Sequence, residues 1–337
     1  MSAGATVTCL ASGSPAGGLR VRFKPGGTAA GPVGLVPGCA VGLFIPGLLV
    51  VAMNVPTARL LISCPDASGI IAAVTGFLAE HQANILEADQ HSNPDDRTFC
   101  MRLVFETRGM DLSCGDFSRY WSPLATRYQM DWRLAQSSDR KRMAILVGKQ
   151  DHCLHDLLLR IRCGEIDADV AMVISNHAHL EAVAVAYGLP FYALAVTADT
   201  KPEQEQKLLK LLDDAGVDFV VLARYMQVLS KRVVDPYQSR IINIHHSFLP
   251  AFAGEKPYRQ AYQRGVKVIG ATAHYVTQEL DAGPIIAQDT VAIDHRDTVG
   301  DLVRKGRDLE RTVLAAAVRL HVEDKILVRR NRTIVFD

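Results

Sequence analysis

Three polar side chains in the second half of the chain have types and spacing that suit acyl chemistry. Asn243 and His245 stand two positions apart after a β-branched apolar run, so in an extended strand both point to the same side. Asp281 follows later, in a loop that a Gly-Pro pair closes. An amide and an imidazole can hold a developing oxyanion, and a carboxylate can accept a proton from a nucleophile. The alternative is an ordinary strand end whose polar groups satisfy one another, and spacing alone leaves both readings open.

The elements that must position these side chains are strands of an open sheet. The run Ile241–Pro250 predicts a buried parallel strand that its proline ends, and regular alternation places His246 on the opposite face from His245. Two more strands are predicted at Val268–Val276 and from Ile285 onward. Because ligands of open α/β sheets bind outside the carboxyl ends of the strands, this edge is the expected site.

The region from residue 143 to residue 337 alternates apolar runs with amphipathic segments. Such alternation implies a doubly wound, mostly parallel sheet. A long helix at Thr298–His321 and a short hairpin complete the predicted domain. The other predicted strands are Met143–Val147, Ala171–Ser175, Tyr192–Val196 and Phe219–Leu222, and the other predicted helices are His152–Arg162, His179–Tyr187 and Pro202–Asp214.

Residues 56–135 predict a smaller, ferredoxin-like unit of order βαββαβ, which the polar linker 136–142 joins to the larger domain. Ser68 is the predicted N-cap of its first helix. Residues 1–55 are rich in glycine, alanine and proline and contain no acidic residue, so we expect a disordered leader. Met53 stands directly before the first good strand and is a candidate initiator.

Composition excludes several classes of function. A formal net charge of +1 over 337 residues gives no electrostatic argument for nucleic acid, and no apolar run is long enough to span a membrane. The seven cysteines are scattered and never spaced as Cys-x-x-Cys, which disfavours a zinc site or a disulfide framework. The expected compartment is therefore the reducing cytoplasm.

The motif Asn243-Ile-His245-His-Ser-Phe-Leu-Pro250, followed by Leu280-Asp281-Ala-Gly-Pro, resembles the formyltransferase family, and within it the formyltetrahydrofolate deformylases. The resemblance implies a formyltransferase-type sheet and hydrolysis of 10-formyltetrahydrofolate to formate and tetrahydrofolate, which supplies formate for purine biosynthesis. It further implies that water attacks the formyl carbon, with Asp281 as base and Asn243 and His245 holding the oxyanion. Neither a metal nor a cofactor is expected, since the folate is itself the substrate.

The same resemblance assigns binding residues outside the catalytic trio. The pterin ring is expected between two segments, one contributing Met226, Gln227, Val228 and Leu229 and the other Thr277 and Glu279. Gln227 departs from the family, which usually has a basic residue there, so only its main-chain contacts are carried over. The start of the first helix, Asp66-Ala-Ser-Gly69, resembles ACT domains, which pair and bind amino acids. An amino-acid effector at Asp66 and Gly69 and a homo-oligomer are the resulting expectations.

Two other functions remain open from the sequence. The first is transfer of the formyl group from 10-formyltetrahydrofolate to an amine acceptor. The loop after the first strand of the large domain, Gly148–Leu154, lacks the glycines with which the related transformylases cradle a phosphate, which disfavours a phosphorylated acceptor. The second is an amino-acid-sensing module with an inactive catalytic domain, which the intact Asn243, His245 and Asp281 disfavour.

Overall fold

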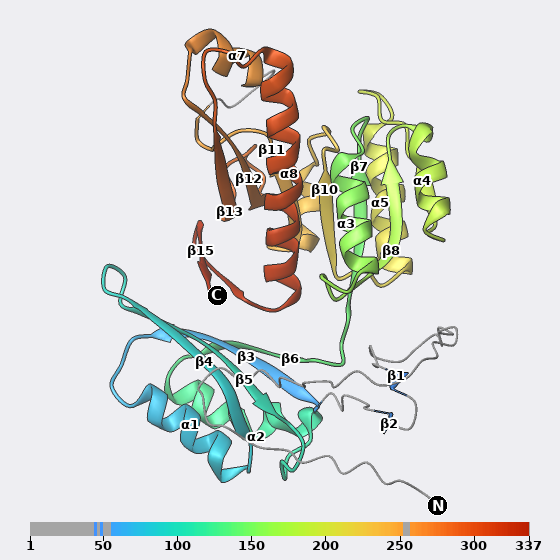
Figure 1. Ribbon diagram of the computed structural model, residues 1–337. Coiled ribbons are helices and arrows are strands. Elements are labelled where there is room, and N and C mark those ends of the chain that lie inside the picture. The colour runs from blue at the N-terminus through green and yellow to red at the C-terminus, as the bar shows by residue number, and fades with distance from the viewer. Residues whose placement is uncertain (1–43, 46–47, 50–54, 252–256, 337) are drawn as a thin grey trace, which may run out of the picture. The chain divides into compact units, whose positions relative to one another are not determined.

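The computed structural model describes residues 44–45, 48–49, 55–251 and 257–336 (Figure 1). In the first two pieces, β1 (Phe44–Ile45) and β2 (Leu48–Leu49) pair as a short antiparallel ladder. The rest of the predicted leader, Met53 included, lies outside the described residues. From Val55 onward the chain forms a separate unit, which contains both predicted domains.

The N-terminal domain has the predicted βαββαβ order. Its antiparallel sheet has the strand order β4-β5-β3-β6, and two helices pack on one face through a shared apolar core. This confirms the ferredoxin-like prediction. The strands are β3 (Thr57–Pro65), β4 (Asn84–Asn93), β5 (Thr98–Glu106) and β6 (Asp131–Gln136), and the helices are α1 (Ile70–Glu80) and α2 (Cys114–Arg127). Residues 137–140 then lead to the next strand, a shorter linker than predicted.

The start of α1 differs from the prediction. Gly69, not Ser68, occupies the N-cap position, and no side chain caps the helix. Gly69 has a backbone φ of 85°, which glycine adopts at little steric cost. Because the chain turns into the helix through this left-handed residue, the prediction of a Ser68 cap was wrong.

The C-terminal domain is built on a seven-stranded sheet of order β13-β12-β11-β10-β7-β8-β9. The five strands from β11 to β9 pair in parallel, whereas β12 and β13 join the edge as antiparallel strands. The mostly parallel prediction is therefore confirmed. The strands are β7 (Lys141–Val147), β8 (Ala168–Ser175), β9 (Phe191–Ala193), β10 (Phe219–Ala223), β11 (Ile241–His245), β12 (Val268–Tyr275) and β13 (Ile285–Ala292).

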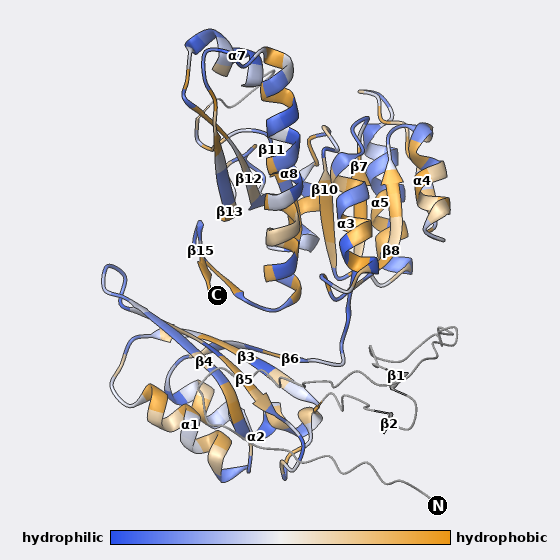
Figure 2. Ribbon diagram, in the orientation of Figure 1, coloured by the Kyte–Doolittle hydropathy of each residue, from blue (hydrophilic) through white to orange (hydrophobic). Residues whose placement is uncertain are grey.

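Helices cover both faces of this sheet. Alternate residues along β7 and β10 enter two separate cores, one shared with α3, α4 and α8 and the other with α5 and α6. The apolar strands between the amphipathic helices are visible in Figure 2. The helices are α3 (His152–Arg162), α4 (Glu181–Ala186) after the short turn η1 (Ala178–Leu180), α5 (Lys201–Asp214), α6 (Lys231–Val234) before η2 (Asp235–Tyr237), and α7 (Pro257–Arg264).

The long helix α8 (Val299–Val322) runs across the face that carries α3. Its start is a capping box, in which Thr298 and Asp301 satisfy each other's backbone N–H groups. The hairpin β14 (Ile326–Arg329) and β15 (Arg332–Val335) follows it, as predicted. Among the described residues, no helix is long and apolar enough to cross a bilayer.

Asp324, just after α8, connects the two domains. Its carboxylate is 1% exposed and lies 3.3 Å from Arg59 Nη1, 2.8 Å from Arg133 Nη2 and 2.6 Å from Lys141 Nζ. Arg102 donates to its backbone carbonyl over 3.0 Å. Three strands of the N-terminal sheet and one of the C-terminal sheet therefore meet at Asp324, three of these strands at its carboxylate and one at its backbone carbonyl.

The strand that carries the predicted oxyanion residues is shorter than expected. β11 ends at His245, five residues before Pro250, and the chain then turns through residues 246–251. The prediction that Pro250 ends the strand was wrong, because the turn has begun well before the proline. On the antiparallel side, Asn243 of β11 stands opposite His274 of β12.

Candidate active site

A cavity of about 700 Å³ opens at the carboxyl ends of β10 and β11, the edge that the sequence predicted. Its wall contains every residue predicted for catalysis and for the pterin: Asn243, His245, Asp281, Met226, Gln227, Val228, Leu229, Thr277 and Glu279. The first three come from β11 and from the loop between β12 and β13. The structure therefore brings together residues that are far apart in the sequence.

Asp281 lies between two histidines. Its Oδ2 is 3.3 Å from His245 Nδ1, and its Oδ1 is 3.7 Å from His274 Nε2. A hydrogen bond from His245, and next in size the effect of the nearby His274 ring, hold the pKa of Asp281 well below its ordinary value, so the carboxylate is ionised at neutral pH. The other ring nitrogen of His245, Nε2, is buried and has no hydrogen-bond partner among the described residues.

Burying an imidazole nitrogen without a hydrogen-bond partner destabilises the fold. At a cavity wall such a nitrogen indicates a group that binds a ligand. The contact of Nδ1 with the carboxylate fixes the ring so that Nε2 is left for the substrate.

Asn243 is oriented by His274. His274 Nδ1 lies 3.0 Å from the carbonyl oxygen of Tyr275, which can only accept, so Nδ1 carries the proton. In the neutral ring Nε2 then accepts a hydrogen bond from Asn243 Nδ2 over 3.1 Å. One N–H of the Asn243 amide is used in this way. The second N–H remains for a carbonyl oxygen in the cavity.

The loop that carries Asp281 approaches β12 closely. Asp281 has a backbone φ of 54°, in the left-handed region. Two residues later, a Cβ atom at Gly283 would stand 1.8 Å from the carbonyl oxygen of Tyr275, so only glycine fits there. The Gly-Pro signal in the sequence therefore marks the close contact that sets the position of the carboxylate.

The flanks of the cavity are apolar and exposed. Met226 is 68% exposed, Val228 55% and Leu280 67%. They belong to the segment after β10 and to the loop after β12, the two segments predicted to enclose the pterin. Exposed apolar side chains on both sides of one cavity suit a flat, mostly apolar ring system.

His246 differs from its predicted position. It lies at the wall of the same cavity as His245, and the two ring centroids are 5.2 Å apart. The prediction of opposite faces was wrong because β11 has already ended, so strand alternation no longer applies. Burial lowers the pKa of His246 to about 4, and the charges of Arg224 and His245 act in the same direction. The ring is therefore neutral at pH 7.

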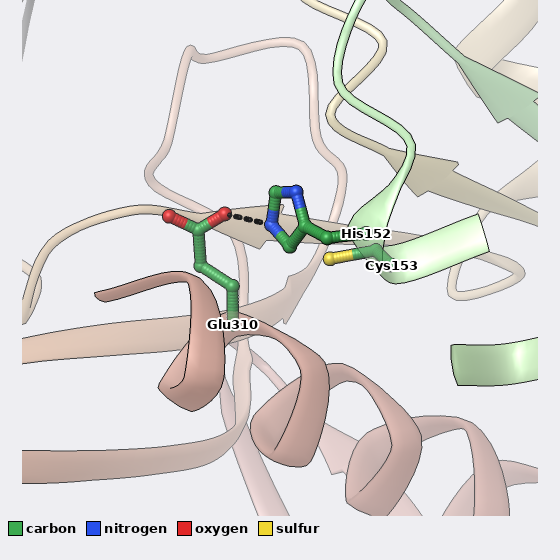
Figure 3. Close-up of side chains that lie close together, drawn as sticks. All are labelled: His152, Cys153 and Glu310. Carbon is green, nitrogen blue, oxygen red and sulfur yellow. Dashed lines mark hydrogen bonds and ion pairs between the residues drawn. The ribbon is translucent and has the colours of Figure 1, made fainter. Parts of the chain in front are cut away.

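A second polar group lies behind the cavity, around Glu310 of α8. Its carboxylate is 1% exposed and accepts a hydrogen bond from His152 Nε2 over 2.8 Å (Figure 3). It accepts a second one from Tyr258 OH over 2.6 Å. Arg224 Nε is 3.5 Å away. Burial raises the pKa of Glu310, but these partners outweigh it and hold the pKa below its ordinary value.

Among the described residues, His152, Cys153 and Glu310 form the one group of three side chains of metal-ligand type (Figure 3). Glu310 already has hydrogen-bond partners, and burial raises the pKa of the Cys153 thiol, which disfavours the thiolate that binds metals. The guanidinium of Arg224 would also repel a cation. This cluster thus fits a hydrogen-bonded network, and the sequence-based expectation that no metal takes part remains a prediction.

The predicted effector residues lie elsewhere. Asp66 and Gly69 line a shallow hollow at the start of α1, together with Gln90 and Ser92 of β4. The hollow belongs to the N-terminal domain, and its lining shares no residue with the cavity at β11.

Sequence reasoning assigned no role to several polar residues of the cavity wall, among them His274, Arg224, Tyr258 and Glu310. The position of His274 within a strand next to the Asn-x-His strand was a usable signal, since cross-strand neighbours contact each other. Tyr258 and Glu310 carry no local signal, because they meet only through the packing of α7 on α8.

Comparisons with known proteins agree with this geometry. Residues 141–318 match the formyl transferase family model, and residues 58–108 match the ACT domain model. The chain is 49% identical over 280 residues to the formyltetrahydrofolate deformylase of Synechocystis sp., an alignment that covers 83% of this chain and 98% of the relative. The chain belongs to the formyltetrahydrofolate deformylase family.

Two further proteins of this family align with most of this chain. The deformylase of Bacillus subtilis is 46% identical over 285 residues, covering 84% of this chain and 95% of the relative. The crystal structure of a formyltetrahydrofolate deformylase from Pseudomonas syringae pv. tomato superposes with a TM-score of 0.83 at 45% identity, covering 85% of this chain and 96% of that one. Both the N-terminal ACT domain and the formyltransferase fold are thereby established.

Proposed function

We propose that this protein hydrolyses 10-formyltetrahydrofolate to formate and tetrahydrofolate. The observation that supports it most strongly is the convergence of Asn243, His245 and Asp281 on one cavity, with Nε2 of His245 and one N–H of Asn243 left for a ligand. Family membership supplies the substrate class, and the exposed apolar flanks of the cavity suit a pterin. Formate release would supply one-carbon units for purine biosynthesis.

In the proposed mechanism the formyl oxygen faces Asn243 and His245. A water molecule attacks the formyl carbon, and Asp281 accepts its proton. The developing oxyanion accepts hydrogen bonds from Asn243 Nδ2 and from Nε2 of His245 in its doubly protonated form, which is the form that this mechanism requires. Such donors act strongly because the site is largely buried and the donors are oriented in advance.

Collapse of the tetrahedral intermediate breaks the carbon–nitrogen bond. The leaving nitrogen takes the proton of His245 Nε2. Solvent then restores a proton to Nε2 and takes the proton held by Asp281, which returns the carboxylate to its contact with His245 Nδ1. The products are tetrahydrofolate and formic acid, which loses its proton to solvent.

A spectrophotometric assay tests the proposal directly. The full-length protein is expected to release tetrahydrofolate and formate in equal amounts from 10-formyltetrahydrofolate, and the rate is expected not to depend on added amines. Formation of a formylated amine at the expense of formate would instead identify a transferase. Absence of any turnover, with folate-analogue binding retained, would support an amino-acid-sensing protein.

For the ACT domain we propose regulation and assembly. The hollow at Asp66 and Gly69 offers the free N–H groups of the α1 start to the carboxylate of an amino acid. The outer strand β4 leaves a sheet edge for pairing with a second copy. Light scattering is expected to show a homo-oligomer, and glycine and methionine are the first effectors to assay. A monomer whose rate no amino acid changes would refute both parts.

The compartment is proposed to be the cytoplasm. Cys64, Cys100, Cys114, Cys153 and Cys163 are all free thiols. Reduced cysteines are typical of a reducing compartment.

A further inference from the structure

Arg224 is a buried cation for which the mechanism above has no role. Its side chain is 8% exposed, yet it lies at the cavity wall. Its backbone φ is +62°, a conformation that residues other than glycine rarely adopt. Strained backbone of this kind is concentrated at active sites and ligand clamps, where the surrounding structure maintains it. The low exposure and the left-handed backbone of Arg224 are therefore typical of a residue that binds a ligand.

Arg224 follows β10 directly, since that strand ends at Ala223, and His245 is the last residue of the neighbouring strand β11. Both residues lie at the wall of the same cavity. The charge of Arg224 also acts on the ring of His246, the next residue. The guanidinium is thus at the end of the sheet that carries the residues proposed to act on the formyl group.

The Nε atom of this guanidinium has hydrogen-bond partners, whereas its two terminal nitrogens have none among the described residues. Nε donates to Gln150 Oε1 over 3.2 Å and lies 3.5 Å from Glu310 Oε2. No described residue accepts a hydrogen bond from Nη1 or Nη2 of Arg224. Two parallel terminal N–H groups match the two oxygens of a carboxylate. The fork is therefore fixed at its base and presented to the cavity.

The base of the fork is itself held in place. Glu310 accepts hydrogen bonds from Tyr258 and His152, so its carboxylate has little freedom. Tyr258 reaches it because Gly306, one turn earlier on α8, has no side chain: a Cβ there would stand 2.1 Å from the tyrosine hydroxyl oxygen. The nearby carboxylate also offsets part of the arginine charge, which favours reversible binding of a small anion.

We propose that Arg224 is the receptor for formate, the one-carbon carboxylate that the proposed hydrolysis produces. The inference rests on the proposed function for the origin of its ligand. The formyl group has one oxygen and formate has two, and the second comes from the attacking water. Once the formic acid product has lost its proton, the fork of Arg224 binds the two oxygens of formate.

Direct binding of formate is the test. Full-length protein without folate is titrated with ¹³C-labelled sodium formate, and binding is followed by broadening of the carbon resonance. Arg224→Gln is expected to bind formate at least about tenfold more weakly, as expected when a charged hydrogen-bond donor is lost. Arg224→Lys keeps the charge without the fork and is expected to weaken binding as well. Arg307→Gln, which removes another cavity-wall arginine, is the control and is expected to bind formate within about twofold of the parent.

Every outcome decides the question. Equal formate affinity in Arg224→Gln and the parent, or no formate binding by the parent, overturns the proposal. Arg224→Gln could fail to fold because Glu310 loses its partner. In that case the double variant Arg224→Gln/Glu310→Gln, which removes both charges, is titrated with formate in place of the single variant. If formate binds at Arg224 but 10-formyltetrahydrofolate is not hydrolysed, the site stands and the proposed function falls. If 10-formyltetrahydrofolate is hydrolysed but formate binding does not depend on Arg224, the proposed function stands and the formate site at Arg224 is refuted.

Discussion

At the scale of single residues, the site depends on the Asp281 carboxylate, which contacts two histidine rings. Asp281 contacts His245 and His274, and His274 in turn orients the Asn243 amide. In the proposed mechanism the same carboxylate also accepts the water proton. Loss of its charge should therefore affect the chemical step far more than substrate binding, because the apolar flanks of the cavity do not depend on it.

Asp281→Asn is expected to bind a folate analogue nearly as well as the parent but to lose at least about a hundredfold in kcat, the lower range for loss of a general base. Steady-state kinetics and analogue titration measure the two effects separately. Asp289→Asn, on the exposed part of β13, is the matched control and should keep the parent rate. Turnover by Asp281→Asn at near the parent rate would exclude Asp281 as the base.

His246 gives a prediction about pH. Its pKa of about 4 means that the ring stays neutral from about pH 5 upward and titrates only below the usual working range. In His246→Gln the acid limb of the kcat/KM profile between pH 5 and pH 8 should therefore keep its position, even if the rate falls. A limb that disappears or moves by a full pH unit in this variant would show that His246 titrates in that range.

The sequence could predict part of this residue-level geometry. Alternation in a strand places Asn243 and His245 on one side, and the family resemblance adds Asp281. His246 was misplaced because the end of β11 is set by the tertiary turn after it, which no local pattern shows. Arg224 was visible only as a neighbour of the pterin segment, since its partner Glu310 is supplied by a helix far along the chain.

At the scale of elements, close backbone contacts set the positions of the catalytic groups. Most strands and helices were predictable because apolar runs, amphipathic periods and the Thr298 start of α8 are local signals. The approach of the Asp281 loop to β12 is not local. It depends on Gly283, where any Cβ would collide with the Tyr275 carbonyl.

Gly283→Ala is expected to push this loop away from β12 and to carry Asp281 away from the two histidines. Overpacking typically costs about 1–3 kcal/mol, so the melting temperature should fall by several degrees. The value of kcat should fall by at least about tenfold, because small misplacements of catalytic groups are costly. Gly76→Ala, in α1 with no atom near its Cβ position, serves as the control for adding a methyl group. Parent kinetics in Gly283→Ala would show that the loop tolerates displacement.

At the scale of the whole molecule, the two domains share a buried charge centre. Asp324 is ionised: burial raises its pKa, but Lys141, Arg133 and Arg59 outweigh that effect and hold the pKa below its ordinary value. The centre lies directly after α8, the helix that carries Glu310 at the cavity. The linker and both domain patterns were readable from the sequence. This junction was not, because its three cations come from three different strands and no spacing rule relates them to Asp324.

Asp324→Asn leaves these cations facing one another without a counter-charge. Removing one partner of a buried ion pair costs about 3–5 kcal/mol, and the half-exposed Arg133 places the expected loss near the lower end. A group with a depressed pKa contributes stability above its ordinary pKa of about 4 and loses that contribution as the pH falls through the folded value. Denaturant unfolding should therefore show a wide gap between parent and variant at pH 7 that closes below about pH 4. Asp199→Asn, at an exposed site, controls for the substitution itself. Equal unfolding midpoints for Asp324→Asn and the parent at pH 7 would mean that the domains are held together by other contacts.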